Sequence, residues 1–142
     1  MPALICGSLA FDTITNFHGR FADQILPDQV HILNVSFLVP TLRREWGGCA
    51  GNIAYNLQLL GGTPVVMAAL GVDGGEYLRR IESWGADTSL IWRDGELHTA
   101  QCHITTDTDN NQITAFHPGA MAHAHRIAVP PRGQRADLAL GI

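Results

Sequence analysis

Cysteine is scarce in this sequence, and a concentration of basic charge is missing altogether. The three cysteines, Cys6, Cys49 and Cys102, are odd in number and far apart in a chain of 142 residues. This excludes a disulfide framework and favours reduced thiols in a cytoplasmic protein. The nine Lys and Arg residues are scattered and the formal net charge is -4. The charge pattern therefore argues against a nucleic-acid partner.

Long apolar runs are missing as well. The apolar stretch at residues 1–12 is too short for a membrane span, and it lacks the basic start and the cleavage site of a signal peptide. We therefore expect no membrane association. Hydrophobic residues make up 46% of the chain and charged residues 15%, a balance that is typical of globular proteins. The length suits one domain or part of a larger one.

Strand-like and helix-like segments alternate in the first two thirds of the chain. Apolar runs predict buried strands at residues 3–6, 64–70 and 89–92. A helix is expected at 50–60, with Ile53, Ala54, Leu57 and Leu60 on one face and Gly61-Gly62 at its end. A second helix is expected to begin at Asp73 as N-cap and to end near residue 84. This alternation predicts an α/β fold with a parallel sheet.

Additional strands are predicted outside this alternation. Apolar and polar residues alternate at 33–39, which predicts a strand with one apolar face. Strands are also expected at 99–105 and 112–116, joined by the turn-forming sequence DTDNN into a hairpin. The terminal ADLALGI, residues 136–142, predicts a further buried strand.

The stretch EWGGCAGNIAYNLQLLGG, residues 45–62, begins a predicted helix with a glycine pair. Gly47 and Gly48 would let a ligand approach the backbone N–H groups, and Asn52 offers both an amide donor and a carbonyl acceptor. Asp12 follows the first predicted strand, at the sheet edge where α/β proteins bind ligands. Together these groups suit a polyol such as a sugar, whereas the alternative is a plain glycine-led helix with Asn52 as a capping residue.

Two phosphate-binding motifs can be excluded for the same stretch. No Lys followed by Ser or Thr comes after the glycines, as a phosphate loop requires. The spacing in GGCAGN also differs from the dinucleotide-binding fingerprint, which makes a Rossmann-type nucleotide binder an unlikely alternative.

Three blocks in order resemble the PfkB (ribokinase-like) family of carbohydrate kinases. GGCAGNIAYNLQLLGG resembles the first family signature, GSLAFD the opening strand with its substrate aspartate, and GVDGGEYLRRIESWGAD the next block. The resemblance implies a three-layer α/β/α sheet with a small β lid, here truncated after the N-terminal half. Residues 1–142 would form that half, with lid segments at about 16–44 and 97–116. The implied substrate contacts are Asp12, Gly47, Gly48 and Asn52.

The sequence NQITAFHPGAM most resembles the adenosine kinase-like branch of the family. That resemblance implies ATP-dependent phosphorylation of a hydroxyl on adenosine or a ribose-like substrate. Phe11, Phe17, Phe37 or Phe116 could then face a nucleobase, although core packing is the stronger expectation for each. In some relatives lids pair between subunits, so a homodimer through the lid is a further expectation.

The second half of the family's length has no counterpart in these 142 residues. In the family that half carries the Gly-Ala-Gly-Asp segment with the general base, the Asn-x-x-Glu segment that places Mg²⁺, and the ATP pocket. We therefore expect the chain to be an inactive substrate-binding half, either a fragment or the product of an interrupted reading frame. The alternative is a genuine short protein that binds sugars or nucleosides, or dimerises, without catalysis.

Other candidate groups have simpler interpretations. His117, His123 and His125 could ligate a metal, but no Cys or carboxylate stands near them in recognised metal spacing, so a solvated loop is expected. Cys49 at a helix start could be a reactive thiol, but a role as a small packing residue is the preferred interpretation. Arg43 and Arg44 could reach a phosphate, although a solvated position is preferred.

Overall fold

A parallel four-stranded sheet is the centre of the molecule. The computed structural model describes residues 2–131 and the backbone of residues 140 and 141. The strands are β1 (Pro2–Cys6), β4 (Thr63–Leu70), β5 (Asp87–Arg93) and β8 (Leu140–Gly141), in the order β5-β4-β1-β8. All neighbours run parallel, which confirms the predicted parallel sheet. Of the predicted strand at 136–142, all but residues 140 and 141 lies outside the described residues.

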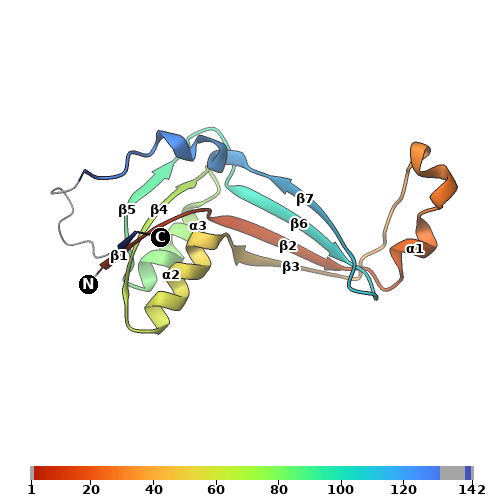
Figure 1. Cartoon of the computed structure of the whole chain (residues 1–142), viewed down its shortest axis with the longest axis horizontal. Coiled ribbons are helices and arrows are strands. Elements are labelled where there is room, and N and C mark those ends of the chain that lie inside the picture. The colour runs from red at the N-terminus through yellow and green to blue at the C-terminus, as the bar shows by residue number, and fades with distance from the viewer. Residues whose placement is uncertain (1, 132–139, 142) are drawn as a thin grey trace.

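Two helices, α2 (Cys49–Leu59) and α3 (Gly75–Ser83), cover one face of this sheet (Figure 1). α2 ends where predicted, because Gly61 adopts a positive φ of 79° that non-glycine residues avoid. The main core lies between the sheet and these helices. Its buried members are Ile5, Leu9, Phe11, Ala50, Ala54, Val66, Ala68, Leu70, Tyr77, Ile81 and Ala86.

The predicted apolar face of α2 is only partly right. Ala54 is fully buried and Leu57 is half-buried, but Ile53 is 37% and Leu60 is 85% exposed. The small residues Ala50 and Ala54 face the sheet instead. Their small side chains let the backbone of α2 approach the sheet closely. The buried stripe of α2 is therefore centred on alanines, and its larger apolar side chains are partly or largely exposed to solvent.

A second, mixed sheet extends away from the first one (Figure 1). It contains β2 (Ala10–Asn16), β3 (Thr41–Gly47), β6 (Ala100–Thr106) and β7 (Gln112–His117), in the order β3-β2-β6-β7. β2 is antiparallel to β3 and parallel to β6, and β6 is antiparallel to β7. The predicted hairpin is therefore confirmed.

The predicted strand at residues 33–39 is wrong. The segment between β2 and β3, hereafter the arm (residues 17–40), contains the short helix α1 (Phe21–Gln24) and a 3₁₀ segment, Pro27–Ile32, and its remainder has no regular structure. The alternation is real, since Val35, Phe37 and Val39 are half-buried between exposed neighbours. However, the segment pairs with no strand of the described sheets. Phe37 packs instead on Phe17 and Phe21, with ring centroids 4.8 and 5.0 Å away.

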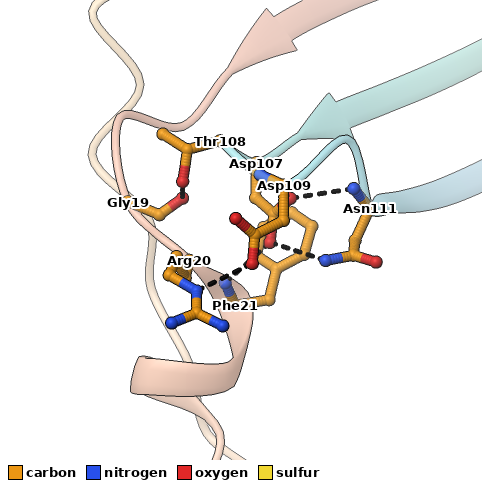
Figure 2. Close-up of polar contacts among 7 residues, drawn as sticks. All are labelled: Gly19, Arg20, Phe21, Asp107, Thr108, Asp109 and Asn111. Carbon is orange, nitrogen blue, oxygen red and sulfur yellow. Dashed lines mark hydrogen bonds and ion pairs between the residues drawn. The ribbon is translucent and has the colours of Figure 1, made fainter.

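One buried carboxylate fastens the arm to the β6–β7 turn (Figure 2). Asp107 accepts hydrogen bonds from the backbone N–H groups of Phe21 at 3.0 Å, Asp109 at 2.9 Å and Asn111 at 2.8 Å. Arg20 adds an ion pair of 2.7 Å with Asp109. Burial alone would raise the pKa of Asp107, but the hydrogen bonds from Phe21 and Asn111 outweigh it and lower that pKa below its ordinary value.

Candidate functional site

The glycine pair lies where β3 of the second sheet passes into α2. A side chain at Gly47 would overlap the carboxylate of Asp12. Gly48 has a φ of 92°, and a Cβ there would collide with the carbonyl oxygen of Ser8 and come within 2.8 Å of the Ala10 nitrogen. Both positions therefore require glycine, for close approach at Gly47 and for backbone conformation at Gly48.

The third glycine of the motif, Gly51, makes room for a tyrosine from α3. A Cβ at Gly51 would overlap the hydroxyl oxygen of Tyr77. That hydroxyl is buried and donates a hydrogen bond of 2.7 Å to the carbonyl oxygen of Gly47. The motif is thus held by a hydrogen bond from a residue 30 positions further along the chain than Gly47.

Ser8 supplies the hydrogen bonds that open α2. Its hydroxyl accepts a bond from the Cys49 N–H and its carbonyl accepts one from the Ala50 N–H, both at 3.0 Å. These partners satisfy two of the N–H groups that a helix start leaves free. The Ser8 hydroxyl and backbone N–H also contact the Cys49 sulfur at 3.4 Å, and the hydrogen bond from the hydroxyl is the main cause that lowers the pKa of that thiol.

Asp12 lies in β2 of the second sheet, and not just beyond the end of the parallel strand where the sequence placed it. The chain leaves the parallel sheet at Cys6 and turns at Gly7 and Ser8 into the new strand. Asp12 is half-buried there, and burial raises the pKa of its carboxyl group. Among residues 2–131, no cation lies within ion-pair distance of this carboxylate.

Asn52 lies one turn into α2, where its backbone N–H donates to the Gly48 carbonyl at 3.1 Å. Its side chain is exposed and borders a hollow of about 200 Å³. The hollow is lined by Glu45, Trp46, Gly51, Asn52, Tyr55, Tyr77, Arg80 and Trp84. The structure therefore brings Asp12, Gly47 and Gly48 together, whereas Asn52 borders a hollow that Asp12 does not line.

Asp73 does not cap α3 as predicted. Gly74 occupies the N-cap position, and the Asp73 carboxylate turns to the second sheet. It accepts hydrogen bonds from the Thr99 N–H at 2.7 Å and the Gln101 amide at 3.3 Å, and Arg44 lies 3.8 Å away. Burial, the largest influence, would raise the pKa of Asp73, but the bonds from Thr99 outweigh it and lower that pKa. The two sheets are joined here.

The aromatic candidates separate into core and surface residues. Phe11 is 2% exposed against Trp46 and Tyr77, and Phe17 and Phe37 belong to the cluster in the arm. Phe116 on β7 is 51% exposed. Asp12 pairs with Cys102, and Cys102 pairs with Phe116. Because paired residues of adjacent strands point to the same face, Phe116 and Asp12 share one face of the second sheet.

The described residues offer neither a metal cluster nor a membrane helix. Within residues 2–131 no group of three His, Cys, Asp or Glu side chains could hold a metal ion. His123 instead contacts Asp94 at 3.2 Å, and His125 contacts the Ala122 carbonyl at 3.2 Å. No helix in this part of the chain combines the length and apolar composition that a membrane crossing needs.

Comparison with known proteins places these features in one family. The family model for pfkB family carbohydrate kinases matches residues 11–136. A nucleoside kinase of Methanocaldococcus jannaschii is 32% identical over 99 residues, which cover 68% of this chain and 33% of that protein. The Burkholderia thailandensis nucleoside kinase, solved in complex with inosine, is 50% identical with a TM-score of 0.80, over 98% of this chain and 43% of that one.

The crystal structure of the Methanocaldococcus jannaschii enzyme itself aligns with a TM-score of 0.77 at 29% identity, over 92% of this chain and 41% of that one. The chain thus spans less than half the length of these relatives, and its fold is the corresponding part of a ribokinase-like fold. The match to the family model covers most of the sequence, including the glycine motif and Asp12. The chain belongs to the pfkB family of carbohydrate kinases.

Proposed function

We propose that this chain is the substrate-binding half of a nucleoside kinase and acts in the cytoplasm. The observation that carries the proposal is the contact between the Asp12 carboxylate and Gly47 at the start of α2. In our proposal the carboxylate accepts hydrogen bonds from two neighbouring ribose hydroxyls, and the N–H groups of the glycine pair donate to substrate oxygens. Asn52 lies in the first turn of the same helix but borders a hollow that Asp12 does not line, so its contact with the same ligand stays a prediction.

Phe116 gives the proposed site a surface for the base. It is an exposed aromatic ring on the face of the second sheet that carries Asp12. Stacking of a base on an aromatic side chain contributes about 1–3 kcal/mol. A sugar held at Asp12 would place an attached base over this sheet, which favours a nucleoside over free ribose. The nucleoside kinase relatives and the inosine complex of the Burkholderia enzyme support the same choice. Assignment to the adenosine kinase-like branch stays a prediction.

Phosphoryl transfer requires groups beyond those described. ATP supplies the phosphoryl group in such kinases, and Mg²⁺ and positive charge stabilise its transfer. Residues 2–131 hold no cluster that fits Mg²⁺, so we assign no catalytic step to them. We propose that ATP, Mg²⁺ and the general base belong to the length that the relatives have in addition, and that the second sheet acts as a lid.

Calorimetric titration of the purified chain with inosine, adenosine and ribose tests the binding proposal. We expect Asp12→Asn to weaken nucleoside binding by about tenfold or more, because hydrogen bonds to a charged acceptor are lost. Asp28→Asn, an exposed carboxylate in the arm, is the matched control and should bind normally. Equal affinity of the Asp12 variant and the unsubstituted chain would refute the role of Asp12.

The role of Phe116 has its own test. Phe116→Ala should weaken inosine binding by about fivefold or more and leave ribose binding unchanged, because only the nucleoside has a base to stack. Ile113→Ala on the same strand is the control. Ile113 is 45% exposed, and its odd offset from Phe116 places it on the opposite face. An equal loss for ribose and inosine would contradict base stacking.

A second candidate function is binding without catalysis, because the proposed substrate contacts Asp12, Gly47 and Gly48 all lie within the described residues. Such a module could bind a nucleoside, or pair with a second copy through the lid. Both candidates predict the same outcome in one assay. Purified 142-residue chain should not phosphorylate inosine with ATP and Mg²⁺, and turnover free of contaminating kinase would contradict an inactive half.

A further inference from the structure

We propose that Tyr77 is a positioning residue: its hydroxyl fixes the Gly47–Gly48 peptide so that the Gly48 N–H faces the substrate side of the second sheet. This inference deepens the proposed function and depends on it for the identity of the ligand. The geometry that carries it does not depend on any ligand.

Tyr77 is built into the molecule as a fixed support. It is 1% exposed, and its ring lies 5.7 Å from that of Phe11 and 5.0 Å from that of Trp46. Its hydroxyl reaches the Gly47 carbonyl at 2.7 Å through the space that Gly51 leaves free. Because the ring is buried among these neighbours, its packing sets the position of the hydroxyl.

The position of one carbonyl oxygen determines the direction of the next N–H. A trans peptide is planar, with its C=O and N–H on opposite sides. Since the Gly47 oxygen points to Tyr77, the Gly48 N–H points away from Tyr77. Successive residues of a strand face opposite sides of the sheet. Trp46 contacts Tyr77 on one face of β3, and the next residue, Gly47, lies beside Asp12 on the other face. The Gly48 N–H is thereby directed to the side of Asp12.

A glycine pair needs such a support more than other sequences do. Glycine populates positive and negative φ about equally, so a Gly-Gly peptide rotates readily unless a neighbour holds it. The Tyr77 hydroxyl also remains a neutral donor, because burial raises the pKa of Tyr77 to about 12. The support is therefore present throughout the physiological pH range.

The test compares Tyr77→Phe with Ile81→Val, a control one turn further along α3. Ile81 is fully buried in the same core, but its side chain has no polar group that could bond to Gly47. We expect Tyr77→Phe to shift the Gly48 amide resonance and to weaken inosine binding by about five- to tenfold. Ile81→Val should change neither, at a temperature where both variants are folded.

Two safeguards keep the test decisive. If Tyr77→Phe does not fold, Gly51→Ala can replace it in the test. This variant keeps the tyrosine but pushes its hydroxyl away from Gly47, so it should produce the same change at Gly48. An unchanged Gly48 amide in the folded variants, or an equal change in Ile81→Val, would overturn the positioning role. If the unsubstituted chain binds no inosine, the proposed function fails, whereas the amide measurements still decide the role of Tyr77.

Discussion

At the scale of single residues, Gly51 determines how closely α2 and α3 approach each other. A methyl group at this position would overlap the Tyr77 hydroxyl and lie 3.2 Å from Leu9 Cδ2. We expect Gly51→Ala to lower the free energy of unfolding by roughly 1–3 kcal/mol, the usual cost of overpacking a core. Chemical denaturation followed by tryptophan fluorescence measures this loss.

A double-mutant cycle identifies the atom responsible. In a Tyr77→Phe background the clash with the hydroxyl is gone, so Gly51→Ala should cost less than in the native background. Gly95→Ala is the control, because a Cβ there meets nothing within 4 Å. It should change the free energy of unfolding by less than about 0.5 kcal/mol. Additive costs for Gly51→Ala and Tyr77→Phe would show that the clash lies elsewhere.

The residues of the site differ in how far the sequence could predict them. Gly47 and Gly48 were predictable, since glycines at a helix start indicate close approach or positive φ, and both occur here. Ser8 and Tyr77 were missed because their partners lie 41 and 30 residues away in the chain. Asp73 was misassigned for the same reason. An aspartate before a helix resembles an N-cap, and only the fold brings Thr99 to its carboxylate.

At the scale of elements, Asp107 is the buried carboxylate among the groups that attach the arm to the β6–β7 turn, which also include Thr108 and Asp109. The folded-state pKa of Asp107 is lowered, so its stabilising effect is present above the unfolded value of about 3.9 and is lost as pH falls through the folded value. We expect the arm to stay closed from about pH 5 upward and to open in acid below about pH 4. Hydrogen exchange at the Phe21 amide, which donates to Asp107, reports the opening directly.

Substitution separates this attachment from the stability of the whole chain. Asp107→Ala should expose residues 17–40 to proteolysis at neutral pH and leave the melting of the parallel sheet nearly unchanged, since the arm has its own small aromatic cluster. Asp23→Ala, an exposed carboxylate in α1, is the matched control and should remain protected. If both variants were cleaved at equal rates, the attachment would not depend on Asp107.

The elements themselves were predictable wherever a local pattern decided them. The strands at 64–70, 99–105 and 112–116 have apolar runs or turn-forming neighbours and appear as β4, β6 and β7. The segment at 33–39 shows that alternation records burial and not pairing, since Val35, Phe37 and Val39 are half-buried without a strand partner. β2 and β3 were missed as a pair because their register joins residues such as Asp12 and Glu45 across the arm.

At the scale of the whole molecule, exposed apolar side chains among the described residues include those of two segments. The first lies at the C-terminal end of α2, where Leu59 is 66% exposed and Leu60, which borders a hollow of about 340 Å³, is 85% exposed. The second lies on the arm, where Leu38 is 88% exposed. Exposed apolar patches commonly lead to association. The 142-residue chain expressed by itself should therefore self-associate as its concentration rises.

Sedimentation velocity on paired variants locates the surface responsible. α2 packs on the parallel sheet, and the related proteins extend well beyond the part of the fold matched here. We therefore expect the exposed leucines at the end of α2 to contribute more to self-association than those of the arm. Leu59→Gln combined with Leu60→Gln should then lower the associated fraction several-fold, because burial of each leucine contributes roughly 1.5–3 kcal/mol. Leu38→Gln should have little effect. The opposite ranking would assign the association to the arm and favour pairing through the second sheet.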